Sequence, residues 1–181
     1  MDQTSDVELA ERARTGDIDA FTVLTERYRL PALRFAYGIA GDEAEDAVQD
    51  AFVKTFRKLD TFRPGTAFRP WLFTIVANEA RNRRRSMSRR SSLELRVRAQ
   101  PQAIGAASDS LAIEHEQRER LLAAVNDLSE RHREIVALRF FAGLSESETA
   151  AVLSCPVGTA KSRLSRSLDL LRSTLGEEVT T

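Results

Sequence analysis

Apolar residues recur at three- and four-residue steps along most of the chain, a spacing that predicts α-helices. In the first half the pattern is interrupted at Gly16, at Gly41 and at a Pro64-Gly65 turn. The segments between these breaks give four expected helices. We therefore expect a compact bundle of four helices over residues 5–85.

The helical pattern stops between residues 86 and 110, where Ser, Arg, Gln and Ala follow one another without a sustained period. We interpret this stretch as a flexible linker between a first domain, residues 1–85, and a second domain, residues 111–181. When fully extended, a linker of this length reaches about 80 Å. The chain is thus predicted to be all-α, with two small helical domains joined by a tether.

The second domain contains a short helix, a tight turn and a longer helix. Ser145 and Glu148 have the spacing of a capping box at the start of the short helix. A turn at residues 154–156 follows, and the last helix is expected over residues 157–175. Its outward positions carry side chains that suit phosphates and base edges in the major groove: Thr159, Lys161, Ser162, Arg163 and Arg166. This order predicts a DNA-binding helix-turn-helix, with an ordinary helical hairpin as the alternative.

Residues 42–60 are expected to form an acidic helix with two stripes. The apolar stripe predicts the buried face and comprises Ala44, Ala47, Val48, Ala51, Phe52, Thr55, Phe56 and Leu59. The second stripe lies outside that face and comprises Asp46, Gln49, Asp50 and Val53. This second stripe is either a solvated charged face or a docking surface for a basic partner helix. A valine beside two carboxylates favours the docking surface.

The next expected helix, residues 71–85, starts apolar and ends basic. Trp71 has core spacing, whereas a polar stripe on another face comprises Asn78, Arg81, Asn82 and Arg85. The preceding turn carries Phe62, Arg63 and Phe68. Unpaired bases need rings to stack on, amides to read base edges and cations for phosphates, and this stretch offers all three. The alternative is that both phenylalanines are core residues and that the arginines are solvated.

Composition restricts the possible functions. The 27 basic and 27 acidic residues cancel, which argues against a simple DNA-binding module, although residues 81–98 are strongly basic. The single cysteine, Cys155, excludes an internal disulfide and fits a reducing cytoplasm. The acidic N-terminus is unlike a signal peptide, and no apolar run is long enough to span a membrane. Neither metal-ligand spacing nor a P-loop is present, so we expect no metal and no cofactor.

The chain resembles bacterial sigma factors of the extracytoplasmic-function (ECF) group of the sigma-70 family over nearly its whole length. In the first half the resemblance is carried by Asp46-x-x-Gln49-Asp50-x-Phe52, Phe62-Arg63, Phe68-Arg69-Pro70-Trp71-Leu72 and Ala77-Asn78. In the second half it is carried by Leu144-Ser145-x-x-Glu148-x-Ala150 and Cys155-Pro156-Val157-Gly158-Thr159-x-Lys161-Ser162-Arg163. Each motif is weak alone, but the set in this order is specific.

The resemblance implies a factor without enzymatic activity that binds core RNA polymerase, directs it to promoters and helps to melt the −10 element. Sigma region 2 would occupy residues 1–85 and sigma region 4 residues 111–181. The stripe with Asp46, Gln49, Asp50 and Val53 would dock on the β′ clamp helices, and the β flap is a further expected contact. An anti-sigma factor is an expected partner, and the expected location is the cytoplasm.

The resemblance also implies two DNA contacts. The −10 element would be held by Phe62, Arg63, Phe68, Asn78, Arg81, Asn82 and Arg85, and Asn78 would line the pocket for a flipped base. The −35 element would be read by Thr159, Lys161, Ser162, Arg163 and Arg166. Extrusion of a base costs stacking and pairing energy, which a pocket and nearby cations can offset without a nucleoside triphosphate.

Three other functions are compatible with parts of the sequence. A stand-alone helix-turn-helix regulator explains the second domain but leaves the acidic stripe and the tether unexplained. A metal-dependent nuclease could be imagined from Asp42, Glu45, Asp46 and Asp50, but carboxylates on a single helix make a poor metal cage. An adaptor without DNA contact is excluded if Arg163→Ala abolishes promoter-specific transcription.

Overall fold

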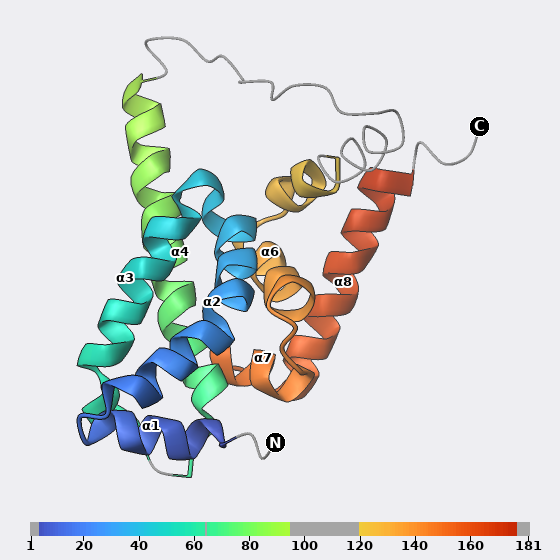
Figure 1. The fold of residues 1–181 in the computed structure, drawn as a ribbon. Coiled ribbons are helices and arrows are strands. Elements are labelled where there is room, and N and C mark those ends of the chain that lie inside the picture. Colours follow the sequence, from blue (N-terminus) through green and yellow to red (C-terminus); the bar gives the residue numbers. More distant parts are fainter. Residues whose placement is uncertain (1–3, 64, 95–119, 177–181) are drawn as a thin grey trace, which may run out of the picture.

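The computed structural model describes residues 4–63, 65–94 and 120–176, all of which form helices and short connections without a strand. Figure 1 shows the long helices of the first half at the left and the helices of the second half packed against them at the right. The predicted all-α class is therefore confirmed for the described residues.

The first half consists of four α-helices, as the pattern predicts: α1 (Asp6–Arg14), α2 (Ile18–Ala40), α3 (Ala44–Arg57) and α4 (Phe68–Glu94). Ser5 and Asp17 cap the first two helices through their side chains, which accept hydrogen bonds from backbone N–H groups. The backbone N–H of Ala20 is the main reason that the pKa of Asp17 lies below its ordinary value. Two 3₁₀ turns, Gly41–Glu43 and Leu59–Thr61, flank α3.

Aromatic side chains fill the centre of the first half. Phe35 and Phe73 are fully buried and meet edge to face, with their ring centroids 6.1 Å apart. Tyr28 contacts Phe73 and also hydrogen-bonds Asp6, so it ties α1 to the bundle. Burial together with the Asp6 carboxylate raises the pKa of the Tyr28 hydroxyl. Through Tyr28 and Phe35, α2 therefore contacts both α1 and α4.

The second half begins with a helical stretch at residues 120–127. The elements that follow are α6 (Glu130–Val136), the π-helical turn η3 (Ala137–Phe141), α7 (Glu146–Val152) and α8 (Val157–Gly176). The capping box is present as predicted, because Ser145 accepts from the Glu148 N–H while the Glu148 carboxylate accepts from the Ser145 N–H. α7, the turn and α8 thus form the predicted helix-turn-helix geometry.

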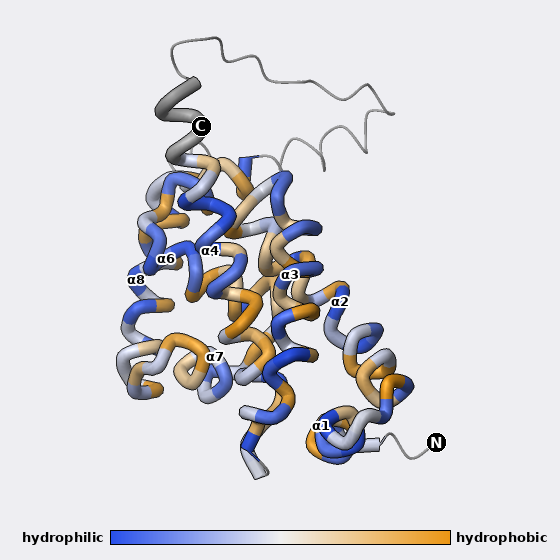
Figure 2. The backbone as a smooth tube through the Cα atoms, turned by 90° about the vertical axis from the view of Figure 1, so that its left-hand side faces the viewer, coloured by the Kyte–Doolittle hydropathy of each residue, from blue (hydrophilic) through white to orange (hydrophobic). Residues whose placement is uncertain are grey.

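The two halves share one apolar core. The cluster that fills the first half also includes Ala137, Leu138, Ala142, Leu144 and Val152 from η3, α7 and the loop between them. η3 packs against α2, and α7 packs against α4. The hydropathy colouring in Figure 2 shows apolar stretches of α7 beside α4. The expected picture of two domains joined by a linker alone is therefore incomplete, because the domains are in contact.

Several details differ from the predictions. α4 continues to Glu94, so the predicted linker start at Ser86 is wrong, and the rest of that linker lies outside the described residues. Pro64 of the predicted turn also lies outside them. Phe56 was predicted to face the core but is 46% exposed. Phe56 instead packs on Phe21, with the ring centroids 5.0 Å apart. Its ring is therefore only partly covered.

Candidate functional site

The acidic stripe lies on the face of α3 that points away from the core. Asp46 and Asp50 have 62% and 47% of their side chains exposed, and Val53 is 45% exposed. Gln49 is exposed as well. The opposite face of α3 is buried through Ala44, Ala47, Val48, Ala51 and Thr55. The two predicted stripes are thus separated in space, and the acidic one is accessible.

Arg83 of α4 organises the carboxylates beside this stripe. Its guanidinium lies 2.6 Å from Asp50, 3.1 Å from Glu43 and 3.3 Å from Asp46. The hydrogen bond to Asp50 is the main reason that the pKa of Arg83 lies above its ordinary value. Sequence reasoning missed Arg83 because it belongs to an arginine run whose members differ in direction by about 100° per residue.

A groove of about 380 Å³ adjoins the stripe between α2 and α3. It is lined by Thr25, Arg29, Leu33, Glu45, Val48, Gln49, Phe52 and Val53. Two members of the stripe, Gln49 and Val53, therefore form one edge of a partly apolar depression. An apolar depression edged by carboxylates can receive a helix that carries both apolar and basic side chains.

The residues of the polar stripe of α4 differ in exposure and in hydrogen bonding. Asn78, Asn82 and Arg85 are exposed, whereas Arg81 is half-buried. Arg81 donates to the Asn78 side-chain oxygen at 2.8 Å and to the Ala77 carbonyl at 3.1 Å. The structure thus gathers these residues on one helical face, with the Asn78 amide oriented by Arg81.

Two of the aromatic residues predicted to stack on bases are buried. Phe62 and Phe68 are 3% and 2% exposed, and both pack against Trp71 with ring centroids 5.2 and 5.7 Å away. Neither ring presents a face to solvent in this arrangement. Both phenylalanines are therefore core residues, as the alternative interpretation has it. Arg63, which follows Phe62, is exposed.

A pocket of about 350 Å³ lies beside this loop. It is lined by Thr61, Arg63, Thr66, Ala67, Pro70, Trp71 and Thr74, with Ala151 of α7 closing one side. Threonine hydroxyls, an arginine and an indole can offer hydrogen bonds and a stacking surface to a base. Asn78 is not among the lining residues. The three threonines could not be recognised from the sequence pattern, because they are spread over the turn Leu59–Thr61, the following loop and α4.

Carboxylates of α6 meet the arginines of the α4 stripe. Arg85 pairs with Glu130 at 3.2 Å, and Arg81 lies 3.5 Å from Glu134, an ion pair too long for a hydrogen bond. Glu134 is only 7% exposed, and its burial raises the pKa of its carboxyl in spite of the nearby positive charge of Arg81. Sequence reasoning did not identify either glutamate.

α8 presents the residues predicted to read duplex DNA. Thr159, Lys161, Ser162 and Arg166 are exposed, whereas Arg163 is half-buried. Lys161 pairs with Glu146 of α7 at 3.0 Å, and Ser162 donates to the Thr159 carbonyl. The inward face is fixed by Ala160 and Leu171, both buried. The outward row therefore extends along the free side of α8.

Within the described part of the chain, no group of three or more His, Cys, Asp or Glu side chains is arranged to hold a metal ion. The carboxylates imagined as a nuclease centre instead surround Arg83 or point to solvent. No helix among residues 4–63, 65–94 and 120–176 is long and apolar enough to cross a membrane.

Comparison with known families gives two matches. Residues 24–90 match the family described as Sigma-70 region 2, and residues 118–171 match Sigma-70, region 4. The sequence is 36% identical over 180 residues to the ECF RNA polymerase sigma-E factor of Escherichia coli K12. That alignment covers 94% of each chain.

Two solved structures are similar to the whole arrangement. CnrH, in complex with the cytosolic domain of CnrY, is 28% identical with a TM-score of 0.72, over 96% of this chain and 98% of that one. The sigma factor RpoE of Bartonella quintana, in complex with the anti-sigma factor NepR, is 33% identical with a TM-score of 0.66. That match covers 87% of this chain and 98% of RpoE.

Proposed function

The chain belongs to the ECF group of the sigma-70 family, and from that premise we propose how its surfaces divide the work of a promoter-directing, non-enzymatic initiation factor. Three surfaces are available: the acidic stripe of α3, the polar face of α4 with its adjoining pocket, and the outward row of α8. The accessibility of the acidic stripe beside a groove is the observation that supports the division best.

The acidic stripe binds the β′ clamp helices of core RNA polymerase. Asp46 and Asp50 supply charge for basic side chains, while Gln49 and Val53 line the groove that receives an apolar residue. Charge complementarity of this kind sets orientation and association rate more than affinity. The second domain contacts the β flap, as the family resemblance implies.

The α4 face and its neighbouring loop bind the melted −10 element. Asn78, Asn82, Arg63 and Arg85 are exposed and suit base edges and phosphates, and Arg81 joins them once its ion pair opens. The pocket beside Trp71 receives the flipped base, so Phe62 and Phe68 act by supporting its wall rather than by direct stacking.

α8 reads the −35 element from the major groove. Thr159, Lys161, Ser162 and Arg166 offer donors from one side of the helix. Arg163 is half-buried and completes the row. The two DNA-binding surfaces, on α4 and on α8, each bind DNA weakly alone. They act together once polymerase holds them on one promoter.

An anti-sigma factor regulates this chain in the cytoplasm. CnrH and the Bartonella RpoE, both similar over most of this chain, are seen with the cytosolic domain of CnrY and with the anti-sigma factor NepR. A cytoplasmic partner fits a factor that acts on RNA polymerase. A pull-down with the purified chain as bait would identify this partner.

Binding to core polymerase tests the division. Asp50→Lys should weaken the affinity for purified core enzyme at least about tenfold, because it places a like charge against the basic partner helix. Asp60→Lys, an exposed aspartate just past α3, is the matched control and should bind as the wild type does. Equal affinity of the two variants would refute the docking assignment.

A further inference from the structure

The groove between α2 and α3 has two walls of opposite charge. Figure 1 shows the two helices side by side, and they pack against each other. From α2 the groove is lined by Thr25, Arg29 and Leu33, and from α3 by Glu45, Val48, Gln49, Phe52 and Val53. The α2 wall therefore has a cation and no carboxylate, whereas the α3 wall has a carboxylate and no cation.

Arg29 of the α2 wall is available to a partner. It is exposed, and its guanidinium forms no ion pair or hydrogen bond with any residue that the structure describes. Arg27, two residues earlier, is instead paired with Asp6 of α1. Glu45, on the other wall, is exposed as well, and within the described ranges no ion pair joins it to Arg29. Both charges can therefore be neutralised by a bound partner.

The basic character of the α2 wall continues toward the end of that helix. A second pocket, of about 600 Å³, shares Leu33 and Glu45 with the groove and is also bordered by Arg34. Arg34 is exposed, and its guanidinium has no ion pair among residues 4–63, 65–94 and 120–176. Since an α-helix has 3.6 residues per turn, Arg29 and Arg34 extend the basic wall over more than one turn.

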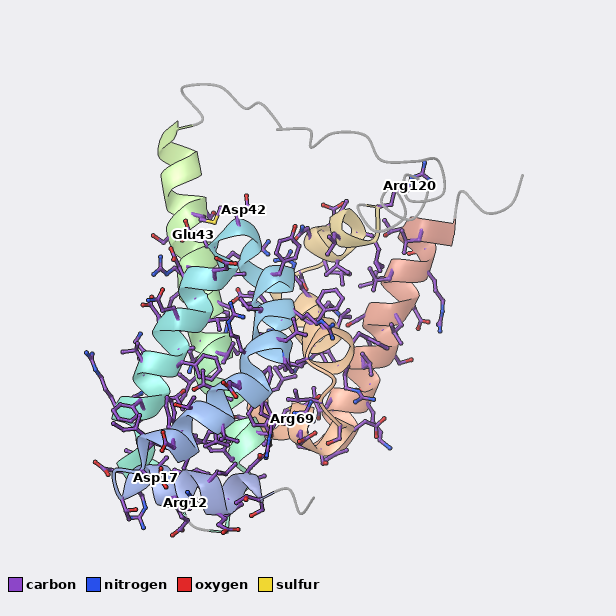
Figure 3. All side chains as sticks on the ribbon, viewed as in Figure 1. Arg12, Asp17, Asp42, Glu43, Arg69 and Arg120 are labelled. Atoms are coloured by element: carbon purple, nitrogen blue, oxygen red, sulfur yellow. The ribbon has the colours of Figure 1, made fainter. Side chains whose placement is uncertain are left out.

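The carboxylates on the α3 side are held in position before a partner binds. Arg83 binds Asp46 and Asp50 through one oxygen of each carboxylate, at 3.3 and 2.6 Å. It also binds Glu43, which Figure 3 shows at the end of α3 beside α4. Asp46 and Asp50 nevertheless keep 62% and 47% of their side chains exposed. The acidic edge is thus both oriented and accessible.

The floor of the groove is apolar and accepts an apolar side chain. Val48 is buried, and Leu33 and Phe52 are half-buried against the same core. A helix that places an apolar residue on this floor brings one flank against α2 and the other against α3. The charges of both flanks are then tested at once.

Walls of opposite charge distinguish the direction of a bound helix. A helix with bases on one flank and an acid on the other fits with its bases toward α3 and its acid toward Arg29. If that helix is reversed in the groove, its flanks exchange places and like charges meet on both sides. Like charges brought together in this way are strongly unfavourable and exclude wrong partners. An acidic stripe alone would accept either direction.

We propose that Arg29 is a specificity-determining residue of the polymerase-docking groove, and that the groove takes a helix with basic side chains along its α3 edge and an acidic side chain along its α2 edge. This inference rests on the proposed docking of polymerase on the acidic stripe. Arg29 pairs with the acid, sets the direction of the partner helix and disfavours helices that are only basic.

The sign of one effect separates this groove from a surface that is only acidic. Arg29→Glu makes the groove more negative, so a surface that merely attracts bases would bind core RNA polymerase more tightly. A groove that holds an acidic side chain at Arg29 should bind it about tenfold more weakly, because a like charge then faces that acid. The Kd of the full-length variant for purified core enzyme is measured beside that of Asp50→Lys.

Arg29→Lys and Arg14→Glu are the controls. Arg29→Lys keeps the charge and should bind core enzyme as the wild type does. Arg14 is exposed on α1 and does not line the groove, so Arg14→Glu makes the same change in net charge elsewhere. At moderate salt its effect should be small, because separated surface charges are screened. Circular dichroism checks that all variants keep their helices.

Unchanged or tighter binding of Arg29→Glu would overturn the proposed role of Arg29. An equal loss for Arg14→Glu would overturn it too, because the loss would then follow net charge. An equal loss for Arg29→Lys would exclude charge as the cause and would also overturn it. The docking assignment itself fails separately, if Asp50→Lys binds core enzyme as the wild type does. The two failures are therefore distinguishable.

Discussion

Neighbouring arginines of α4 contact different partners, because successive residues of a helix point in different directions. Arg81 and Arg85 point toward α6, where Glu134 and Glu130 meet them. Arg83 points the other way, to the carboxylates of α3. Arg84 donates to the Ile39 carbonyl near the end of α2. A basic run that looks uniform in the sequence is thus divided between the carboxylates of α6, those beside the acidic stripe of α3 and the end of α2.

Removal of Arg83 should expose the repulsion between the carboxylates that it holds. We expect Arg83→Ala to lower the free energy of unfolding by about 1 kcal/mol at low salt, the upper end for exposed ion pairs. The loss should shrink at high salt because screening weakens both the attraction and the repulsion. Urea unfolding at two salt concentrations measures this, with Arg57→Ala, at the end of α3, as the control. A loss that does not depend on salt would contradict the electrostatic role.

Glu134 should make stability depend on pH. Its pKa is raised in the folded chain, so the folded state binds this proton more tightly than the unfolded state. The favourable contribution is complete below the ordinary value of 4.5 and is lost as pH rises through the raised value. Glu134→Gln should therefore be more stable than the wild type at neutral pH, and this advantage should vanish in acid.

Urea unfolding at several pH values checks this difference, with the exposed Glu26→Gln as the control. A Glu134→Gln variant that is less stable than the wild type at neutral pH would show that the attraction of Arg81 outweighs the cost of burial.

At the scale of elements, α7 sets the direction of α8. The Ser145–Glu148 capping box fixes where α7 begins, and buried Ala150 and Ala160 join α7 to α8 in a small core with Ile135. The Lys161–Glu146 pair adds a surface link. The orientation of the outward row of α8 therefore depends on where α7 begins.

Loss of the cap should weaken the helix-turn-helix. Ser145→Ala should lower the free energy of unfolding by about 1 kcal/mol, as the loss of other N-caps does. Ser147→Ala is the control, because that exposed hydroxyl contacts Ser145 and no N–H of the helix end in the described structure. Thermal unfolding followed by circular dichroism measures both variants. Equal stability of the two would show that the cap contributes nothing to α7.

Elements governed by local chemistry could be predicted from the sequence. The caps at Asp17 and Ser145 and the buried stripe of α3 depend on residues three or four apart, and the structure has them. The end of α4 was misjudged, because a polar arginine- and serine-rich helix without an apolar face resembles a linker. Burial of Phe62 and Phe68 could not be decided either, because it depends on how Trp71 packs from the next helix.

At the scale of the molecule, the contact between the halves decides what is accessible. It depends on Gly38 and Phe141, and on Arg69 and Ala142, pairs that are far apart in the sequence. A single glycine within a helix and a single arginine in the first turn of α4 carry no periodic signal for such a contact. The sequence therefore predicts the two domains but not the contact between them.

The most direct test is transcription by sigma-free core RNA polymerase, supplied with the purified chain and a promoter library, with the start sites sequenced. Initiation should come from a narrow promoter class with shared upstream and start-proximal motifs. Asn78→Ala should reduce melting at the start-proximal motif, and Arg163→Ala should lose discrimination upstream. Absence of specific starts, together with tight binding of duplex DNA by the chain alone, would contradict this account and favour a stand-alone regulator.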